Sequence, residues 1–379
     1  TAGYRPTVTG TSTIGTTWVY NVNNLSRTAP QSENTVFPRS AQIAVTQTLY
    51  NGNRTFNGVR QAESTVLQSR ETLRQSELTV LSATATAYMN VLRDTALLRL
   101  QENNTEVVAQ QLKQTRDRFQ VGEVTRTDVA QSEAAVALSN ANAFTARSNL
   151  QNSLAVYRQL VGEQPKNLSP AKPIDHLIPK KLEEAINRAM ADHPLIQAGL
   201  HAVDAAALNV KVQEGTLYPT LSVTGSYGQT WDTANAPHSK TTTASAIGTL
   251  TIPIYDGGLN YANIRQAKEQ LGQARLAVDV QRETIRSQVV SAWGAYQNTK
   301  LIIQSFQAQV RANEIALNGV REEARVGQRT TLDVLNSQQT LLTSRANLIT
   351  AQRDQVVNSF ALVLAMGRMR SEEHTSELQ

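Results

Sequence analysis

Hydrophobic and polar residues alternate with a period of two in four segments of this chain. These segments are residues 7–20, 40–50, 220–231 and 244–254. In the third, apolar residues such as Leu221 and Val223 alternate with threonine and serine. Alternate residues of a strand lie on opposite faces, so each segment predicts a strand with one apolar face and one hydroxyl-rich face. The segments are also about as long as a tilted strand that crosses a bilayer.

Two longer segments have the pattern of helices. Residues 58–119 contain no proline over 62 positions (119 − 58 + 1), and residues 265–325 also lack proline. A continuous helix of the first length would extend about 90 Å at a rise of about 1.5 Å per residue. Large apolar residues are sparse and Gln, Asn, Ser, Thr and Ala are frequent. This pattern predicts helices with a narrow apolar seam for a neighbouring helix and a broad polar face.

The chain contains an internal repeat. Tyr50-Asn51-Gly52 matches Tyr255-Asp256-Gly257, an offset of 205 residues (255 − 50). The same offset relates Arg60-Gln61-Ala62 to Arg265-Gln266-Ala267, Val121-Gly122 to Val326-Gly327, Thr125 to Thr330, Asp128-Val129 to Asp333-Val334, and Gly162 to Gly367. One offset that holds over this whole stretch indicates a duplication, in which each half comprises strands followed by two long helices.

The middle of each half predicts a tight turn between two helices. Gly122 and Gly327 occupy positions where a helix ends and the backbone becomes left-handed. Thr125-x-x-Asp128 and Thr330-x-x-Asp333 then have the spacing of a capping box that starts the next helix. Each half therefore predicts an αα-hairpin, and spacing alone assigns these Thr and Asp residues to capping.

The repeat predicts a division of the chain. The first repeat is residues 1–163, with a β-hairpin at 4–50 and a helical hairpin at 58–161 whose tip is 121–128. Residues 164–181 form a Pro-rich connector. The second repeat is residues 182–368, with helices at 182–214, a β-hairpin at 217–255 and a helical hairpin at 259–366 whose tip is 326–333. The helices at 182–214 have no counterpart in the first half, so we expect a similar segment to be missing before residue 1. Residues 370–379 break the pattern and resemble a translated sequencing adapter, so we expect a non-native tail.

Composition excludes several functions. The chain has no cysteine, which excludes disulfides, zinc–thiolate sites and thiol catalysis. The net charge is +5, and no basic block interleaved with aromatic residues indicates nucleic-acid binding. None of the five histidines has the spacing of a metal ligand or a catalytic partner, and no nucleotide-binding motif is present. We therefore predict no catalytic residue, no cofactor and no metal. The chain contains no run of 18 apolar residues, so the sequence predicts no transmembrane helix.

The number of strands bears on oligomerisation. A soluble sandwich with one wet face would show the same alternation. In lipid, however, a four-stranded sheet would leave two edges whose backbone groups lack partners. Single-chain barrels begin at about eight strands. If these strands cross a membrane, several chains must therefore share one barrel.

Together, the strand-to-helix turns YNG and YDGG, the two VGxxTxxDV hairpins and the duplication resemble the TolC family of outer-membrane efflux proteins over residues 3–368. The resemblance implies an α+β membrane channel in which three chains of four strands build one twelve-stranded barrel in outer-membrane lipid. Long helices would form an α-barrel across the periplasm. The channel would work with a periplasmic adaptor protein and an inner-membrane pump of the RND or ABC type, for multidrug export or type I protein secretion.

The resemblance also implies roles for the hairpin tips. Arg329 and Asp333 match an arginine and an aspartate of the family's periplasmic constriction, and Asp128 matches the aspartate of the first hairpin. Asn336 stands where some members carry a second aspartate, and Ala324 where they carry a tyrosine. Whether Asp128 only caps its helix or also gates stays open. The residues implied to contact the adaptor are Val121, Gly122, Thr125, Val326, Gly327 and Thr330.

A soluble periplasmic coiled-coil adaptor, or another structural protein, is the alternative. It would share the helical hairpins, but an adaptor should carry a compact β-domain instead of four long strands divided between two halves. The exported cargo, small molecules or proteins, does not follow from the sequence.

Overall fold

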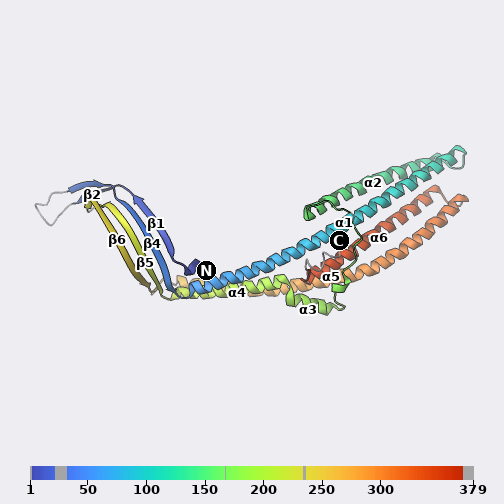
Figure 1. Cartoon of the computed structure of the whole chain (residues 1–379). Helices are drawn as coiled ribbons and strands as arrows, with labels where there is room; N and C mark the ends of the chain where they lie inside the picture. The colour runs from blue at the N-terminus through green and yellow to red at the C-terminus, as the bar shows by residue number, and fades with distance from the viewer. Residues whose placement is uncertain (1, 22–31, 167, 234–235, 370–379) are drawn as a thin grey trace. The chain divides into compact units, whose positions relative to one another are not determined.

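The computed structural model describes residues 2–21, 32–166, 168–233 and 236–369, and long helices dominate it (Figure 1). The elements in chain order are β1 (Thr7–Ile14), β2 (Thr17–Asn21), β3 (Ser32–Val36), β4 (Arg39–Asn51), α1 (Arg54–Gln120), α2 (Arg126–Val161), α3 (Leu182–Asp192), α4 (Pro194–Glu214), β5 (Thr220–Thr233), β6 (Ala236–Thr251), α5 (Leu259–Arg325) and α6 (Thr331–Ala365). Short 3-10 turns occur at Ala2–Tyr4, Asp175–Leu177 and Gly215–Leu217. The expected non-native tail, residues 370–379, lies outside the described residues.

The chain divides into two compact units, and each draws on both repeats. The first unit, here called the strand unit, consists of Thr1–Ser69 and Ala198–Val278. The second, the hairpin unit, consists of Arg70–Gln197 and Asp279–Gln379.

The strand unit contains an antiparallel sheet with the order β1-β4-β5-β6 (Figure 1). Strands β4 and β5 pair over most of their length, so the first and second repeats meet in the middle of the sheet. Strands β1 and β6 are the two outer strands.

The two faces of this sheet differ in the way that the alternation predicts. On one face, Val45 lies opposite Val8 and Gly225. On the other, Thr46 lies opposite Thr7 and Thr224. Hydroxyl groups bond across strands on this second face, in the pairs Thr13–Ser40 at 2.6 Å, Thr46–Thr224 at 3.2 Å and Ser226–Ser245 at 2.8 Å. Cross-strand pairs of this kind stabilise the register of a sheet.

The prediction of one continuous strand over residues 7–20 was wrong. Strand β1 ends at Ile14, and β2 leaves the sheet to pair with β3 in a separate two-stranded sheet. The backbone N–H of Gly15 donates to the carbonyl of Pro38 at 3.0 Å. Proline has no N–H to return, so the β1–β4 ladder ends at this point.

The last predicted strand was shifted. Strand β6 begins at Ala236 and ends at Thr251, whereas the alternation placed it at 244–254. Pro253 follows two residues after the observed end, where it cannot donate to a ladder.

The internal duplication is visible in the backbone. Helices α1 and α5 each contain 67 residues, and their first and last residues differ by the repeat offset. Glycines with positive φ occur in three pairs at the same offset, Gly52 with Gly257, Gly122 with Gly327, and Gly162 with Gly367. The predicted combination of a helical fold, a four-stranded contribution to a sheet and a duplicated organisation is therefore confirmed.

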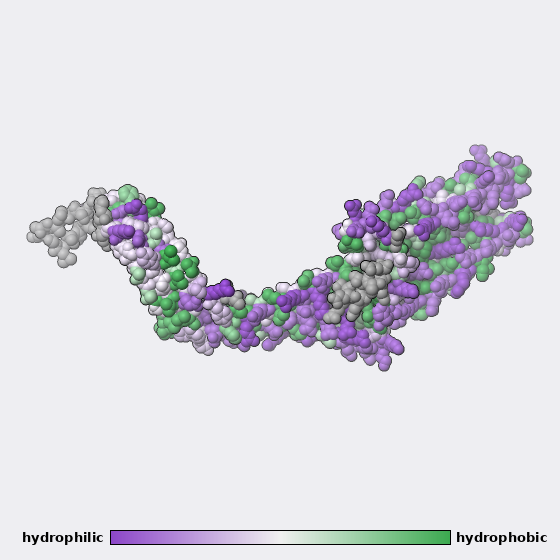
Figure 2. Space-filling view, viewed as in Figure 1, coloured by the Kyte–Doolittle hydropathy of each residue, from purple (hydrophilic) through white to green (hydrophobic). Residues whose placement is uncertain are grey.

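The main core of the hairpin unit lies where helix α3 and the connector cover the long helices. Fully buried residues of this core are Leu78, Ile174, Ala185, Ala189, Ile196, Ile285, Val289, Leu362 and Met366. Elsewhere on the hairpins the visible surface is predominantly hydrophilic (Figure 2). No helix in the described parts of the chain combines the length and the apolar character that crossing a bilayer requires.

Candidate functional site

The tip of the first helical hairpin is built by backbone hydrogen bonds. Gly122 has φ +80°, and its N–H donates to the carbonyl of Phe119 at 3.0 Å. The N–H of Glu123 donates to the carbonyl of Arg118 at 2.9 Å. This pair of bonds is a Schellman motif, which satisfies the last carbonyls of α1 and needs a residue that tolerates left-handed geometry. The prediction that Gly122 ends the helix in left-handed geometry is confirmed.

The tip of the second hairpin has the same geometry. Gly327 has φ +81° and donates to the carbonyl of Ala324 at 3.2 Å. The N–H of Gln328 donates to the carbonyl of Glu323 at 2.9 Å. The sequence therefore specifies two tips of equal backbone shape, and they differ in the side chains that they present.

Each tip begins its second helix with a capping box. The Thr125 hydroxyl and N–H donate to the Asp128 carboxylate at 2.7 and 2.9 Å, and the Thr330 hydroxyl and N–H donate to Asp333 at 2.8 and 3.0 Å. The return bond from each Asp N–H to the Thr hydroxyl oxygen is also present. The predicted capping role of all four residues is confirmed.

These bonds fix the charge of both carboxylates. The Thr125 hydroxyl is the main group that lowers the pKa of Asp128 below its usual value. The Thr330 N–H is the main group that lowers the pKa of Asp333. Hydrogen bonds to a carboxylate favour its charged form. The Asp128 and Asp333 carboxylates are therefore negatively charged at neutral pH.

An arginine–glutamate pair accompanies each tip. Arg329 Nε donates to Glu323 at 2.9 Å, and Arg118 Nε donates to Glu123 at 2.9 Å. In the first tip the glutamate follows the arginine, whereas in the second it precedes the arginine. Glu323 raises the pKa of Arg329, and the nearby charge of Asp333 adds to that effect. Sequence reasoning missed both glutamates, although each lies five or six residues from its partner across a predicted turn.

The remaining predicted positions are also located. Asn336 is exposed on α6 about one turn beyond Asp333. Ala324 is half-buried and packs against a small apolar cluster of Leu317, Val334 and Leu341 between α5 and α6. Val121 and Val326 are 71% and 70% exposed, so each tip presents an exposed valine to its surroundings.

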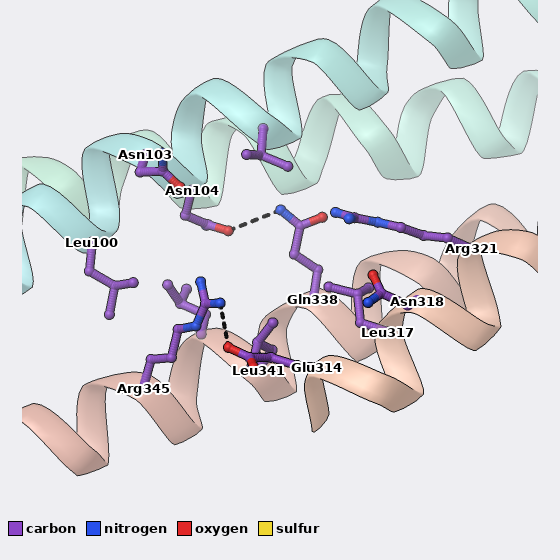
Figure 3. Close-up of a pocket in the computed structure, with 12 residues that line it drawn as sticks. Leu100, Asn103, Asn104, Glu314, Leu317, Asn318, Arg321, Gln338, Leu341 and Arg345 are labelled. Carbon is purple, nitrogen blue, oxygen red and sulfur yellow. Dashed lines mark hydrogen bonds and ion pairs between the residues drawn. The ribbon is translucent and has the colours of Figure 1, made fainter. Parts of the chain in front are cut away.

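A polar groove lies beside the helices of these hairpins. A cavity of about 480 Å³ is lined by residues of α1, α5 and α6 (Figure 3). Gln338 Nε2 donates to Asn104 Oδ1 at 3.2 Å across it, and Arg345 donates to Glu314 at 2.7 Å. Arg321 extends into the same space toward Gln338 (Figure 3).

A second cavity, of about 860 Å³, shares Val107 and Arg321 with the first and extends to Arg118 and Glu123 at the tip. Its walls carry Gln110, Gln111 and Gln114. The two neighbouring cavities, here together called the groove, carry amide, guanidinium and carboxylate groups, and the second cavity reaches the first tip. Among the described residues, no cluster of three His, Cys, Asp or Glu side chains could hold a metal ion.

The chain is similar to known proteins over most of its length. The sequence model of a family described as "Outer membrane efflux protein" matches residues 1–163 and 185–368. Outer membrane efflux protein BepC of Brucella suis biovar 1 is 39% identical over 372 residues, which covers 98% of this chain and 79% of that protein. Outer membrane protein TolC of Escherichia coli K12 is 27% identical over 359 residues, with 88% and 70% covered.

Solved structures show the same fold. The Campylobacter jejuni CmeC outer membrane channel superposes with a TM-score of 0.81 at 19% identity, covering 99% of this chain and 80% of that one.

Proposed function

This chain belongs to the outer membrane efflux protein family, and from that membership we propose that it is one subunit of a trimeric exit duct gated at its helical tips. It is a protein of the bacterial outer membrane with a long periplasmic part. In the proposed assembly, a periplasmic adaptor and an inner-membrane pump deliver small molecules or proteins to the duct. The duct moves its cargo without catalysing a reaction on it.

The sheet supports the proposal of a shared barrel. It has an apolar face suited to lipid and a hydroxyl face suited to a wet lumen. Its outer strands, β1 and β6, leave backbone N–H and C=O groups that hydrocarbon cannot satisfy. Pairing of β1 of one chain with β6 of the next would satisfy these groups and close the sheet, and four strands from each of three chains give a barrel above the size of the smallest known ones.

Extraction tests this assembly against the alternative of a soluble adaptor. We expect the protein to fractionate with outer membranes, to require detergent for release, and to migrate as a heat-resistant trimer. A monomer that remains in aqueous solution after cell lysis would contradict the proposal.

The tips support the proposal of a gate. Asp128 and Asp333 place fixed negative charge at the ends of both hairpins, and Arg329 lies close enough to Asp333 for its charge to act on that carboxylate. In a trimer these groups would gather around one opening. Arginine side chains would then hold neighbouring tips together through their carboxylates, and loss of those links would let the opening widen.

Replacement of Arg329 tests the gate. We expect Arg329→Ala to raise the resting single-channel conductance in planar bilayers several-fold, because the variant removes the ion pair with Glu323 and leaves Asp333 without its neighbouring cation. The matched control is Arg325→Ala, which removes an equal charge from a looser pair with Glu322 at 3.8 Å. Equal conductance of Arg329→Ala and the unmodified protein would contradict a role of Arg329 in closure.

The groove and the exposed valines support the adaptor as the partner at the tips. Val121 and Val326 offer apolar contacts, and the groove beside them offers amide and guanidinium groups for hydrogen bonds with a polar helix. An apolar centre with a polar surround is the usual composition of such an interface. Gly122, Thr125, Gly327 and Thr330 hold the shape of this surface by the turns and caps described above.

A further inference from the structure

A separate cavity lies under the connector in the hairpin unit. Its volume is about 850 Å³, within the range of small-molecule sites in proteins. Four segments enclose it: α1, α2, α6 and the connector between α2 and α3. Its walls are mainly aliphatic, with Leu92, Leu150, Leu154, Leu168, Ile349 and Val356 among them.

Hydrogen bonds at two points of the connector tie it to the long helices α1 and α5. The Tyr88 hydroxyl donates to the Ser169 carbonyl at 2.6 Å and accepts from the Ser169 N–H at 2.9 Å. Farther along the connector, Asp175 accepts from the Tyr296 hydroxyl at 2.5 Å and from Lys300 at 3.1 Å. Pro170 and Pro173 restrict the backbone between Ser169 and Asp175, and Pro165 restricts it before Ser169. These bonds and prolines together favour one path of the connector beside the cavity.

All charged residues that line the cavity are basic, but they differ in whether an acidic group pairs with them. Arg93 is neutralised by Asp94, which it contacts at 2.8 and 3.0 Å, and Arg353 is neutralised by Asp354 at 2.5 Å. Arg99 and Lys172 also line the cavity, and neither has an ion-pair or hydrogen-bond partner among the residues that the structure describes. Both side chains are exposed. The cavity thus combines an aliphatic interior with two uncompensated positive charges at its edge.

We propose that this cavity binds a single-chain anionic amphiphile, an aliphatic tail with a carboxylate or sulfate head. The tail occupies the aliphatic walls, where burial of its methylene groups drives binding. The head forms charge-assisted hydrogen bonds with Arg99 and Lys172. Arg99 and Lys172 would repel a cationic head, and they would form weaker hydrogen bonds with a neutral hydroxyl than with an anionic head. The site shares no residue with either hairpin tip and does not depend on the proposed gate.

Calorimetric titration of laurate into the full-length protein in nanodiscs of neutral phosphatidylcholine tests this site, with empty nanodiscs as the blank. We expect one saturable site per chain for laurate, and binding at least about tenfold weaker for dodecanol, because an uncharged hydroxyl forms weaker hydrogen bonds with Arg99 and Lys172 than a carboxylate does. Arg99→Gln and Lys172→Gln should each weaken laurate binding by about the same factor. Leu154→Trp should block the cavity and abolish saturable binding.

The matched control is Arg311→Gln, which removes an exposed arginine of α5 that does not line the cavity. It should bind laurate like the unmodified protein. Equal affinity for laurate and dodecyltrimethylammonium would overturn the proposal, as would unchanged laurate affinity in both charge variants. Saturation by a two-chain anionic phospholipid but not by laurate would also overturn it and would identify a lipid site instead.

Discussion

Gly52→Ala is expected to destabilise the strand unit by about 2–5 kcal/mol, more than the corresponding change in the second repeat. Gly52 has φ +66°, and left-handed geometry costs an alanine about 1–2 kcal/mol. A Cβ added at Gly52 would lie 2.2 Å from the carbonyl oxygen of Gly215 and 2.9 Å from Tyr218 Cβ. Since the nearest atom belongs to the backbone, the turn itself must move, and overpacking of this kind typically costs about 1–3 kcal/mol more.

The second repeat provides the control. Gly257 occupies the equivalent position with φ +70°, but a Cβ added there would meet nothing within 4 Å. Gly257→Ala should therefore lower the stability only by the cost of left-handed geometry for an alanine, about 1–2 kcal/mol. Thermal unfolding of both detergent-solubilised variants, followed by circular dichroism, gives the comparison. Equal shifts of the two midpoints would show that the close approach between Gly52 and Gly215 does not form.

Acidification is expected to remove about 3 kcal/mol of stability from the hairpin unit through His193. This residue lies between α3 and α4 and is 2% exposed. Burial lowers the pKa of its imidazole to about 4, and the charge of Arg74 adds to that effect. The unfolded chain binds a proton near pH 6.5, whereas the folded chain does not until about pH 4. The contribution of neutral His193 to the free energy of unfolding is therefore complete above pH 6.5. It declines by about 1.4 kcal/mol per pH unit as the pH falls from 6.5 to 4.

His193→Asn isolates this effect. The neutral imidazole accepts the Leu195 N–H through Nδ1 at 3.2 Å, which caps the start of α4, and an asparagine oxygen can accept at such a position without titrating. We expect the thermal midpoint of the unmodified protein to fall more steeply between pH 6.5 and 4.5 than that of the variant. Thermal midpoints that fall equally with pH in the two proteins would contradict the role of His193 in this pH dependence. This holds even if the two proteins differ in stability at neutral pH.

The parts of this fold that sequence predicts are those set by local backbone chemistry. Glycine at a helix end and threonine at a helix start each have one favourable geometry, so Gly122, Gly327, Thr125 and Thr330 could be placed from spacing alone. Alternation likewise separated the apolar and hydroxyl faces of the sheet, because strand geometry fixes which residues share a face.

The parts that sequence missed depend on residues distant in the chain. The end of β1 follows from the bond between Gly15 and Pro38, which no local pattern of residues 7–20 contains. The main core needs Ile174 and Ala185 to reach the long helices, so the sparse apolar residues of those helices did not reveal it. The Arg329–Glu323 pair spans a turn, and only the shape of that turn brings the two side chains together.

The reversal potential of the purified protein in a planar bilayer under a salt gradient tests the central claim most directly. That claim is a membrane duct whose tips carry fixed negative charge, and carboxylates around a pore favour cations. We expect discrete conductance steps with cation selectivity, and a clear loss of that selectivity in Asp333→Ala. Absence of conductance, or a selectivity that Asp333→Ala leaves unchanged, would contradict a duct gated at these tips.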